Sequence, residues 1–503
     1  MVAFADLSLS FLTGLSGLTV RDASSGSLDA ACTGNTQLEV RSTVCEQIAA
    51  NVSSSSVVYY TGEYFHQYTK DNYHWSASSI QASQCSFEPA TTEDVGIALR
   101  ILGQTQTPFG IKSGGHAANP GFSSTSGVQI AMYSFSDVVY NSTAQTATVG
   151  TGLLWDDVYV ALEQYNVTVV GAKVTGIGVG GVALGGGYSY LTNQYGLGFD
   201  NVVAFELVLP NGTVTDITNS TNPDLFFALR GGFNNFGIVT RVTVKTYPQS
   251  LVWGGRVSYA QDQWEAASSA IANYSANVSD PKASIYNTYN YISGVVQVSS
   301  ILFYDAPTRP EGIFDEFLSI PHIEEDISTR SYVNLVQSLP LNLTSGLRSV
   351  FHWVAMEEVT VPMLNMIANE TLFWGEELTN SSARIVSYDI DVYLSTLYDH
   401  VDSPTAYPPS RSRGYSFIEV YYGWTDSDLD DTMFDAVNAS AKHMIQALTD
   451  GGQDIANVAV YPNNAPPNTS LERMYGDNVS RLQVIKKAVD PDNVMGLTGG
   501  WKF

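Results

Sequence analysis

Two glycine-rich segments constrain the fold and the chemistry of this chain more than any other feature. Residues 113–116 read Ser-Gly-Gly-His, and glycine occupies seven of the twelve positions from Gly176 to Gly187. Glycine adopts positive φ and lets the backbone approach a ligand closely, and successive backbone N–H groups in such turns bind anions. Lys and Arg together number only 23 in 503 residues. We therefore expect both segments to hold a large planar ligand that carries a pyrophosphate group, mainly through the backbone.

A nicotinamide-binding fold is the alternative explanation of the second segment. Gly176-Ile-Gly-Val-Gly-Gly181 fits the pattern G-x-G-x-x-G, and Asp200 follows at about the distance of a ribose-binding acid. That pattern belongs at a strand–helix junction early in a βαβ unit. Here Gly185-Gly-Gly187 interrupts the expected helix, and each glycine costs about 1 kcal/mol relative to Ala. A nicotinamide-dependent dehydrogenase is thus the weaker hypothesis.

Composition and charge exclude several classes of partner. The length of 503 residues favours about three structural units. Asp and Glu outnumber Lys and Arg by 49 to 23, so that the net charge is −26, and such a surface repels phosphate backbones and anionic lipids. No apolar run reaches the ~18 residues of a membrane span. We expect no nucleic-acid partner, no membrane partner, and a monomer that acts on small molecules.

Thirteen Asn-x-Ser/Thr sequons favour a glycosylated, secreted protein. They begin at Asn51, Asn141, Asn166, Asn211, Asn219, Asn273, Asn277, Asn342, Asn369, Asn380, Asn438, Asn468 and Asn478. Residues 1–40 are expected to be either a signal segment or a disordered one. Asp6 and the lack of any Lys or Arg before Arg21 fit a signal peptide poorly.

The three cysteines, Cys32, Cys45 and Cys85, all lie near the start of the chain. In an oxidising compartment Cys45 and Cys85 are the expected pair, which would close a loop of about 40 residues and stabilise the fold by roughly 3–4 kcal/mol. Cys32 would then be left over, and three reduced cysteines are the alternative. The chain has no C-x-x-C and no pair of His residues at ligand spacing, so we expect no structural metal.

Hydrophobic periodicity predicts alternating helices and strands over 86–250, with hairpins among them. Thr91 or Thr92 is expected to cap a helix whose apolar positions are Val95, Ala98, Leu99 and Leu102. A second helix is expected over 155–162. Strands are expected over 108–112, 146–149 and 238–247, and a hairpin from 203–209 and 214–217.

Residues 251–450 differ in character, because long aromatic strands dominate them. The pattern predicts strands over 284–303, 385–398 and 415–424, helices over 263–276 and 432–448, and a last helix over 471–488. Residues 86–250 alternate between helices and strands but also contain hairpins, so we predict an α+β fold with a mixed sheet. Residues 251–450 are predicted to form a second domain with an antiparallel sheet.

Several motifs occur in the order found in a known family. Lys112-Ser-Gly-Gly-His-Ala117 resembles the pyrophosphate loop of the covalent-flavin oxidoreductases of the vanillyl-alcohol oxidase superfamily, and is most similar to the berberine-bridge-enzyme-like branch, which includes fungal oligosaccharide oxidases. Supporting segments are 176–181, 185–188, 195–197, 200–202, 230–232, 237–240, 490–491 and 499–500. The resemblance covers roughly residues 40–503.

This resemblance implies a domain organisation. Residues 41–250 would form a two-part FAD-binding domain of the PCMH type, with its core at about 86–250. Residues 251–450 would form a substrate-binding domain in which helices cover a large antiparallel sheet. Residues 451–503 would return to the FAD-binding domain, as in berberine-bridge enzymes.

The resemblance also implies that His116 is bonded to the 8α-methyl group of FAD. Relatives often form a second bond from a Cys just before the G-x-G segment, where this chain has Val174, so a single covalent link is expected. The other residues expected to contact FAD are Lys112, Ser113, Gly114, Gly115, Ala117, Gly176, Gly180, Gly181, Gly186, Gly187, Ile238, Val239 and Asn463.

Three residues are the candidates for catalysis. Glu419 falls where relatives place an acidic or amide side chain on a strand of the substrate domain, and Tyr421 shares its face of that strand. Tyr188 matches a tyrosine that lines the flavin pocket in relatives. A solvated glutamate and a packing tyrosine are the alternatives. The family's C-terminal tyrosine, often catalytic, is replaced by Asn464, so a mechanism based on that phenolate is in doubt.

The function implied is oxidation of an alcohol-type C–H bond in a sugar, an aromatic alcohol or a secondary metabolite, with hydride transfer to covalent FAD. Molecular oxygen is the expected acceptor. Ile177 stands where the family controls oxygen access, so oxidase and dehydrogenase both stay open, as does a cyclase of secondary metabolism. A secreted binding glycoprotein without redox activity is the alternative from another class.

Overall fold

The structure is a computed structural model that describes residues 44–62, 65–292, 294–338, 344–401 and 403–503. The predictions for residues 1–40 and for Cys32 concern residues outside these ranges. Residues 41–503 group into one compact unit, so the predicted boundaries at 250 and 450 stay predictions. Among the described helices, none is long and apolar enough to cross a membrane.

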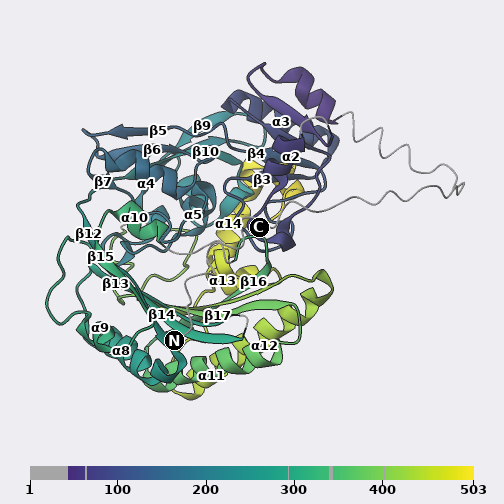
Figure 1. Ribbon diagram of the computed structural model, residues 1–503. Helices are drawn as coiled ribbons and strands as arrows, with labels where there is room; N and C mark the ends of the chain where they lie inside the picture. The colour runs from purple at the N-terminus through teal and green to yellow at the C-terminus, as the bar shows by residue number, and fades with distance from the viewer. Residues whose placement is uncertain (1–43, 63–64, 293, 339–343, 402) are drawn as a thin grey trace, which may run out of the picture. The chain divides into compact units, whose positions relative to one another are not determined.

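Two sheets form the N-terminal part (Figure 1). In the first, β2, β4 and β3 are parallel and β1 pairs antiparallel with β2; its order is β1 (Val57–Tyr60), β2 (Cys85–Glu88), β4 (Val128–Ala131), β3 (Phe109–Lys112). The second is antiparallel, in the order β5 (Val138–Asn141), β6 (Thr146–Gly150), β10 (Ile238–Lys245), β8 (Val202–Val208), β9 (Val214–Ile217). Strands β7 (Val167–Thr168) and β11 (Tyr247–Pro248) pair antiparallel as a separate two-stranded sheet. The predicted hairpin is thus confirmed as β8 and β9.

One helix of this part begins at the cap predicted for it. The predicted helix at 91–102 is α3 (Thr92–Thr105), and the side chain of Thr91 accepts a hydrogen bond from the backbone of Asp94 at its start. The others are a helix over 44–51, α2 (Phe65–Asn72), α4 (Trp155–Glu163), α5 (Val179–Gly185), α6 (Thr192–Tyr195) and α7 (Pro223–Leu229). A disulfide between Cys45 and Cys85 confirms the predicted pairing and ties the first of these helices to β2.

A seven-stranded antiparallel sheet dominates residues 251–450. Its order is β15 (Glu324–Arg330), β12 (Val252–Ala260), β14 (Val295–Tyr304), β13 (Ala283–Ile292), β17 (Ala383–Val392), β18 (Ser416–Trp424), β16 (Arg348–Met356). Helices α8 (Trp264–Asn277), α11 (Val361–Glu377) and α12 (Asp430–Asp450) cover one face of it (Figure 1). Short helices α9 (Asp315–Ser319) and α10 (Tyr332–Gln337) lie at its margin.

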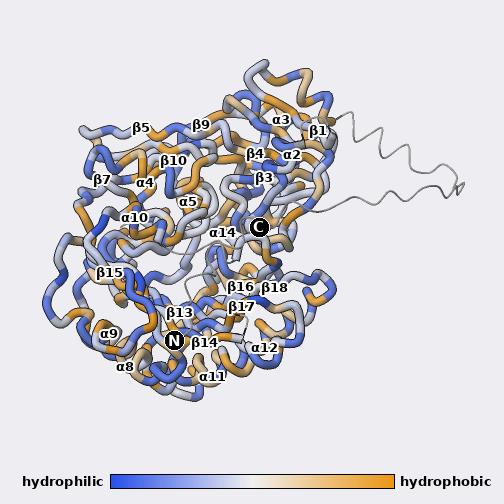
Figure 2. Tube along the Cα trace, in the orientation of Figure 1, coloured by the Kyte–Doolittle hydropathy of each residue, from blue (hydrophilic) through white to orange (hydrophobic). Residues whose placement is uncertain are grey.

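Alternation along the strands gives this sheet two different faces. Ile285, Ile390 and Ile418 are buried on the face that the helices cover. Their neighbours in sequence, Tyr286 and Glu419 among them, point to the opposite face, which borders a cavity. In Figure 2 the apolar stretches follow the strands and helices, whereas the connecting loops are mostly hydrophilic.

Three of the sequence-based element predictions were wrong in detail. The strand predicted over 385–398 ends at Val392, the last residue of β17. The strand predicted over 284–303 is the hairpin β13–β14, which turns at Gly294 with φ of +88°. The helix predicted over 471–488 is two helices, α13 (Leu471–Tyr475) and α14 (Asn478–Val489), separated at Gly476 with φ of +48°. Strands β12, β15 and β16 and helix α11 were not predicted.

The C-terminal segment packs against the N-terminal sheets. Phe109 of β3 forms a bridge with Thr498, and the Asn119 side chain donates a hydrogen bond to the Ala465 carbonyl at 2.9 Å. Trp501 donates its indole N–H to the Pro462 carbonyl at 3.2 Å. These contacts bring residues 462–501 to the same cavity as the glycine-rich segments.

Candidate active site

A large cavity lies between the glycine-rich segments and the seven-stranded sheet. Its open space, mouth included, measures about 1850 Å³. Of the residues predicted from the sequence, those that line it are Ser113, Gly114, Gly115, His116, Ala117, Gly180, Gly181, Gly187, Tyr188, Ile238, Val239, Glu419 and Asn463. The loops of the N-terminal part and one strand of the sheet therefore face one common space.

Four predicted site residues are not among those that line the cavity: Lys112, Gly176, Gly186 and Tyr421. The Lys112 ammonium donates hydrogen bonds to the Lys70 carbonyl at 2.7 Å and to the Tyr133 hydroxyl at 2.8 Å. The Gly176 N–H donates to the Asp156 carboxylate at 2.8 Å. Both residues thus support the loops from behind, and their contact with a cofactor stays a prediction.

The two glycine-rich segments cross each other at backbone distance. A Cβ atom on Gly114 would lie 2.6 Å from the Gly178 backbone, and one on Gly178 would lie 2.3 Å from the Gly114 nitrogen, so only glycine fits at the crossing. The Ser113 hydroxyl donates to the Thr151 carbonyl at 2.5 Å and accepts from the Gly180 N–H at 3.0 Å. One hydroxyl therefore fixes both segments to the end of β6.

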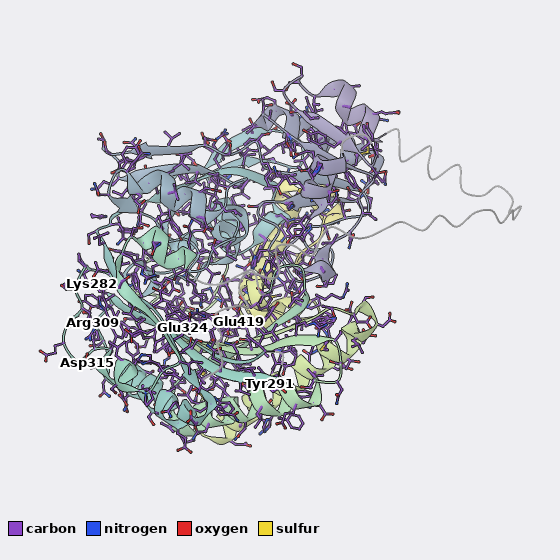
Figure 3. All side chains as sticks on the ribbon, in the orientation of Figure 1. Lys282, Tyr291, Arg309, Asp315, Glu324 and Glu419 are labelled. Atoms are coloured by element: carbon purple, nitrogen blue, oxygen red, sulfur yellow. A yellow bond between two sulfur atoms is a disulfide. The ribbon has the colours of Figure 1, made fainter. Side chains whose placement is uncertain are left out.

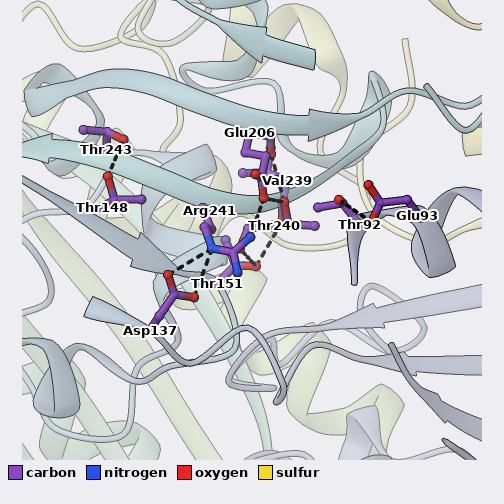
Figure 4. Close-up of polar contacts among 10 residues, drawn as sticks. All are labelled: Thr92, Glu93, Asp137, Thr148, Thr151, Glu206, Val239, Thr240, Arg241 and Thr243. Atoms are coloured by element: carbon purple, nitrogen blue, oxygen red, sulfur yellow. Dashed lines mark hydrogen bonds and ion pairs between the residues drawn. The ribbon is translucent and has the colours of Figure 1, made fainter. Parts of the chain in front are cut away.

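A polar network anchors this crossing on the five-stranded sheet (Figure 4). The backbone N–H of Thr151 donates to the Thr240 carbonyl at 3.0 Å, and the Thr240 hydroxyl donates to Glu206 at 2.5 Å. Arg241 donates to Glu206 at 2.7 Å and to both carboxylate oxygens of Asp137 at 3.0 Å. Three strands thus hold the loops in place.

The donor groups of the cavity fit FAD. A Cβ atom on Gly181 would meet nothing within 4 Å, so this glycine opens the wall of the cavity rather than filling a packing contact. Apart from His116 and the tyrosines, the ionisable residues that line the cavity are Lys173 and Glu419. A pyrophosphate would therefore be bound chiefly by backbone N–H groups, as the sequence indicates.

His116 ends the first glycine loop, immediately after Gly115 with its φ of +73°. Its side chain is half-buried, and this burial lowers the pKa of the imidazole to about 4. The ring is therefore neutral at physiological pH and keeps a nitrogen lone pair available, which is the state that a nucleophile requires.

Glu419 lies on β18 and points to the cavity from the opposite side (Figure 3). It stands directly across from Asp389 of β17 in the antiparallel register, and its Oε2 accepts a hydrogen bond from the Asn464 amide. Burial, and next the negative charge of Asp389, raise the pKa of the Glu419 carboxyl to about 8. Asn464, which replaces the family's tyrosine, thus contacts the candidate base directly.

Two further acids lie on the same face of β17. Asp389 accepts hydrogen bonds from the Tyr286 hydroxyl at 2.8 Å and the Ser387 hydroxyl at 2.6 Å, and burial raises its pKa to about 6. Asp391 forms a buried ion pair with Lys173, whose ammonium also lies 4.1 Å from the centre of the Tyr286 ring. The sheet and the second glycine segment are therefore joined by charge as well as by packing.

Tyrosines close the inner end of the cavity. The Tyr188 hydroxyl lies 3.3 Å from that of Tyr398, and its ring meets Tyr461 edge-on at 5.0 Å. Tyr461 accepts a hydrogen bond from the Gly187 N–H at 2.9 Å, and a Cβ atom on Gly186 would lie 2.6 Å from its ring. Burial raises the pKa of Tyr188 well above its usual value, so Tyr188 stays protonated and can donate but not act as a base.

Sequence reasoning missed several residues around Glu419: Lys173, Tyr286, Asp389, Asp391 and Phe417. A signal for the two acids was present, because they alternate within an otherwise apolar strand and period two puts them on one face. Nothing in the sequence indicates that Lys173 pairs with Asp391, since Lys173 lies in the loop between β7 and α5 and Asp391 lies on β17, 218 residues further along the chain.

Comparison with known proteins agrees with this geometry. Residues 83–218 match the family described as FAD binding domain, and residues 460–498 match the one described as berberine and berberine like. An uncharacterized FAD-linked oxidoreductase of Arthroderma benhamiae is 39% identical over 270 residues, which are 53% of this chain and 54% of that protein. The FAD-dependent monooxygenase drtC of Aspergillus calidoustus is 28% identical over 493 residues, 93% of this chain and 92% of that protein. This chain thus spans about half the length of the first relative and nearly all of the second.

Solved structures share the fold. The 6-hydroxy-D-nicotine oxidase of Arthrobacter nicotinovorans superposes with a TM-score of 0.73 at 18% identity, covering 89% of this chain and 98% of that one. A carbohydrate oxidase of Microdochium nivale superposes with a TM-score of 0.72 at 18% identity, covering 90% and 97%. Residues 83–218 and 460–498 are thus similar to two flavin-associated families, and the chain shares the fold of these solved oxidases over most of its length.

Proposed function

We propose that this protein oxidises an alcohol-type C–H bond of a small molecule with FAD that is covalently linked through His116 alone. The observation that carries the proposal is that His116, on the glycine loop, and Glu419, on β18, line one and the same cavity. One wall offers a neutral imidazole on the loop that fits FAD, and the other offers a carboxylate on the rigid sheet. Val174 also lines the cavity, at the position where a second link would need a Cys.

Bound FAD would act as the hydride acceptor, and molecular oxygen would then reoxidise the reduced flavin. Glu419 would accept the proton of the substrate hydroxyl as the C–H bond breaks. Asn464 holds Oε2 of that carboxylate, while no hydrogen bond from the described residues reaches Oε1. We therefore assign Oε1 as the proton acceptor. Tyr188 can donate a hydrogen bond at the inner end of the cavity.

The walls near Glu419 support a substrate with an aromatic ring. Tyr286, Phe351 and Phe417 line this part of the cavity, and their rings offer stacking surfaces for an aromatic alcohol, a secondary metabolite or a sugar ring. The polar groups beside them are already paired with one another. Because these polar groups already bond to one another, few of them are left to bind the hydroxyls of a sugar. This favours an aromatic substrate over a sugar, since each buried sugar hydroxyl needs a hydrogen-bond partner.

Covalent attachment is tested on the purified full-length protein. We expect the acid-precipitated pellet to remain yellow, and the tryptic peptide that contains His116 to carry the mass of one FAD. H116A should release all of its flavin into the supernatant. A yellow supernatant from the wild type contradicts the covalent link, and protein that never carries flavin favours a binding glycoprotein instead.

The acceptor is tested by reducing the enzyme with a panel of aromatic alcohols and sugars without oxygen, and then admitting air. Rapid return of the oxidised flavin spectrum with one hydrogen peroxide per turnover supports an oxidase. Slow return of the oxidised flavin spectrum, combined with fast turnover on an artificial electron acceptor, identifies a dehydrogenase. In that case Ile177, which lines the cavity, is the residue to substitute. A cyclised product would instead identify a cyclase of secondary metabolism.

A further inference from the structure

The imidazole of His116 is stacked on an indole. The ring centres of Trp75 and His116 lie 4.3 Å apart, and their planes differ by 20°. No hydrogen bond from the described residues reaches the His116 side chain. The stack with Trp75 is therefore the contact that sets the plane of the imidazole and the direction of its nitrogen lone pair.

Trp75 is itself fixed from both sides. Its backbone N–H donates to the Gly115 carbonyl at 2.9 Å, and its own carbonyl accepts from the Gly346 N–H at 2.9 Å. Its indole lies 5.9 Å from the Phe351 ring on β16 and 5.7 Å from the Tyr421 ring on β18. The glycine loop and the substrate-side sheet thus hold Trp75 between them, and this bracing makes its position independent of the His116 side chain.

We propose that Trp75 is the positioning residue for flavin attachment, because its stack presents the His116 nitrogen to the 8α carbon in one orientation. The inference rests on the covalent link proposed above. Attachment forms a C–N bond and breaks one C–H bond of the methyl group and the N–H bond of the imidazole. The two protons and two electrons released convert molecular oxygen to hydrogen peroxide. A ring that rotates freely would reach the productive orientation rarely, and small losses of orientation slow such steps by about 10²-fold.

This role also gives Tyr421 a place in the site. Its ring lies 4.9 Å from that of Phe351, and both support Trp75 from the sheet. Tyr421 therefore acts behind the wall of the cavity, which explains why it shares the face of Glu419 without lining the space.

The test measures attachment itself rather than turnover. Full-length protein made without flavin is mixed with FAD, and covalent flavin is followed by its fluorescence in denatured protein over time. We expect W75A to bind FAD but to attach it about 10²-fold more slowly than the wild type. W75F, which keeps an aromatic face, should retain most of the rate.

Trp264 provides a matched control. It begins α8, remote from the cavity lining, and it is half-buried with an indole N–H that, like that of Trp75, has no partner among the described residues. W264A should attach FAD at the wild-type rate. Far-UV circular dichroism and the melting temperature show whether each variant is folded.

Three outcomes would overturn the inference while leaving the covalent link intact. These are wild-type attachment by W75A, an equal loss in W264A, and a W75A protein that is folded but no longer binds FAD, which would make Trp75 a binding residue. A wild-type protein without any adduct contradicts the covalent link and removes the inference with it.

Discussion

The carboxyl groups of Glu419 and Asp389 compete for one proton. They face each other across β17 and β18, where opposite side chains have Cβ atoms about 5 Å apart. With pKa values of about 8 and about 6, Asp389 is the ionised member near pH 7 and Glu419 carries the proton. The pair therefore has to lose a proton before Glu419 can act as a base.

This competition predicts a pH profile. Since the pKa of Glu419 is raised, the ionised base is scarce below pH 8 and abundant above it, so kcat/KM should rise with pH and level off above about 8. D389N removes the neighbouring charge, so Glu419 should ionise more easily and the rise should move about one pH unit lower. Asn keeps one acceptor, Oδ1, so it can still accept from one of the two hydroxyls, that of Tyr286 or that of Ser387.

The measurement is kcat/KM against pH for both proteins, with Lys173 and Asp391 left unchanged. The control is S387A, which removes one hydrogen bond to Asp389 but no charge. An unchanged midpoint in D389N would show that the two carboxyl groups do not share a proton.

A second prediction at this scale concerns the base itself. E419Q keeps the size of the side chain and can still bind Asn464, but it cannot accept a proton. The rate of flavin reduction by substrate should fall by about 10²–10⁴-fold, whereas covalent flavin content should not change. Full turnover in E419Q, measured by stopped-flow flavin reduction, would exclude Glu419 as the base.

At the scale of elements, the ion pair of Lys173 and Asp391 joins the second glycine segment to β17. The side chain of Asp391 is 2% exposed and that of Lys173 is 14% exposed. Loss of one partner from a buried pair leaves an unpaired charge and typically costs about 3–5 kcal/mol. The crossing of the glycine loops thus depends on the sheet that carries Glu419.

D391N should therefore lower the free energy of unfolding by about 3–5 kcal/mol, measured by urea denaturation. The double variant K173M/D391L should recover much of the loss, because it buries no charge. E324Q serves as the control, because Arg256 and Glu324 form a pair in which Glu324 is 49% exposed, and its loss should cost under about 1 kcal/mol. Equal losses in D391N and E324Q would refute a special role for the buried pair.

At the scale of the whole molecule, the sequence predicted the part of the site that is local. The 113–116 loop, the cap at Thr91 and the 203–217 hairpin are set by short-range rules, and the structure confirms these elements. Glu419 came from a resemblance that fixes a position on a strand. Trp75 and Lys173 could not be found in the same way, because their neighbours are determined by packing between distant segments.

Glycosylation is the prediction that belongs to this scale. Ten sequon asparagines are exposed and can accommodate a glycan: Asn51, Asn141, Asn166, Asn211, Asn219, Asn273, Asn277, Asn369, Asn380 and Asn468. We propose that the protein is secreted and carries glycans at several of them. Asn478 should be unmodified, because it is half-buried and its amide donates to the carbonyls of Thr405 and Ala406, at 3.3 Å and 2.9 Å, in a distant segment of the chain.

Glycopeptide mass spectrometry of protein from its native host tests this prediction site by site. Occupied sites at exposed asparagines with an empty Asn478 are expected. A protein with no glycan at any site would contradict secretion through a glycosylating pathway. Light scattering on the same sample tests the proposed monomer, with an expected polypeptide mass of 54.4 kDa.

The walls of the cavity are made at different times. His116 and the loops around it emerge early from the ribosome, whereas Pro462, Ala465 and Trp501 emerge late, and Asn119 meets Ala465 across 346 residues of sequence. A nascent chain therefore cannot form the complete flavin site until both the early loop around His116 and the late C-terminal segment have been translated. Only molecules that have been fully translated and have formed the contact between Asn119 and Ala465 should bind the coenzyme. The yellow colour of the flavin should therefore identify completely folded molecules.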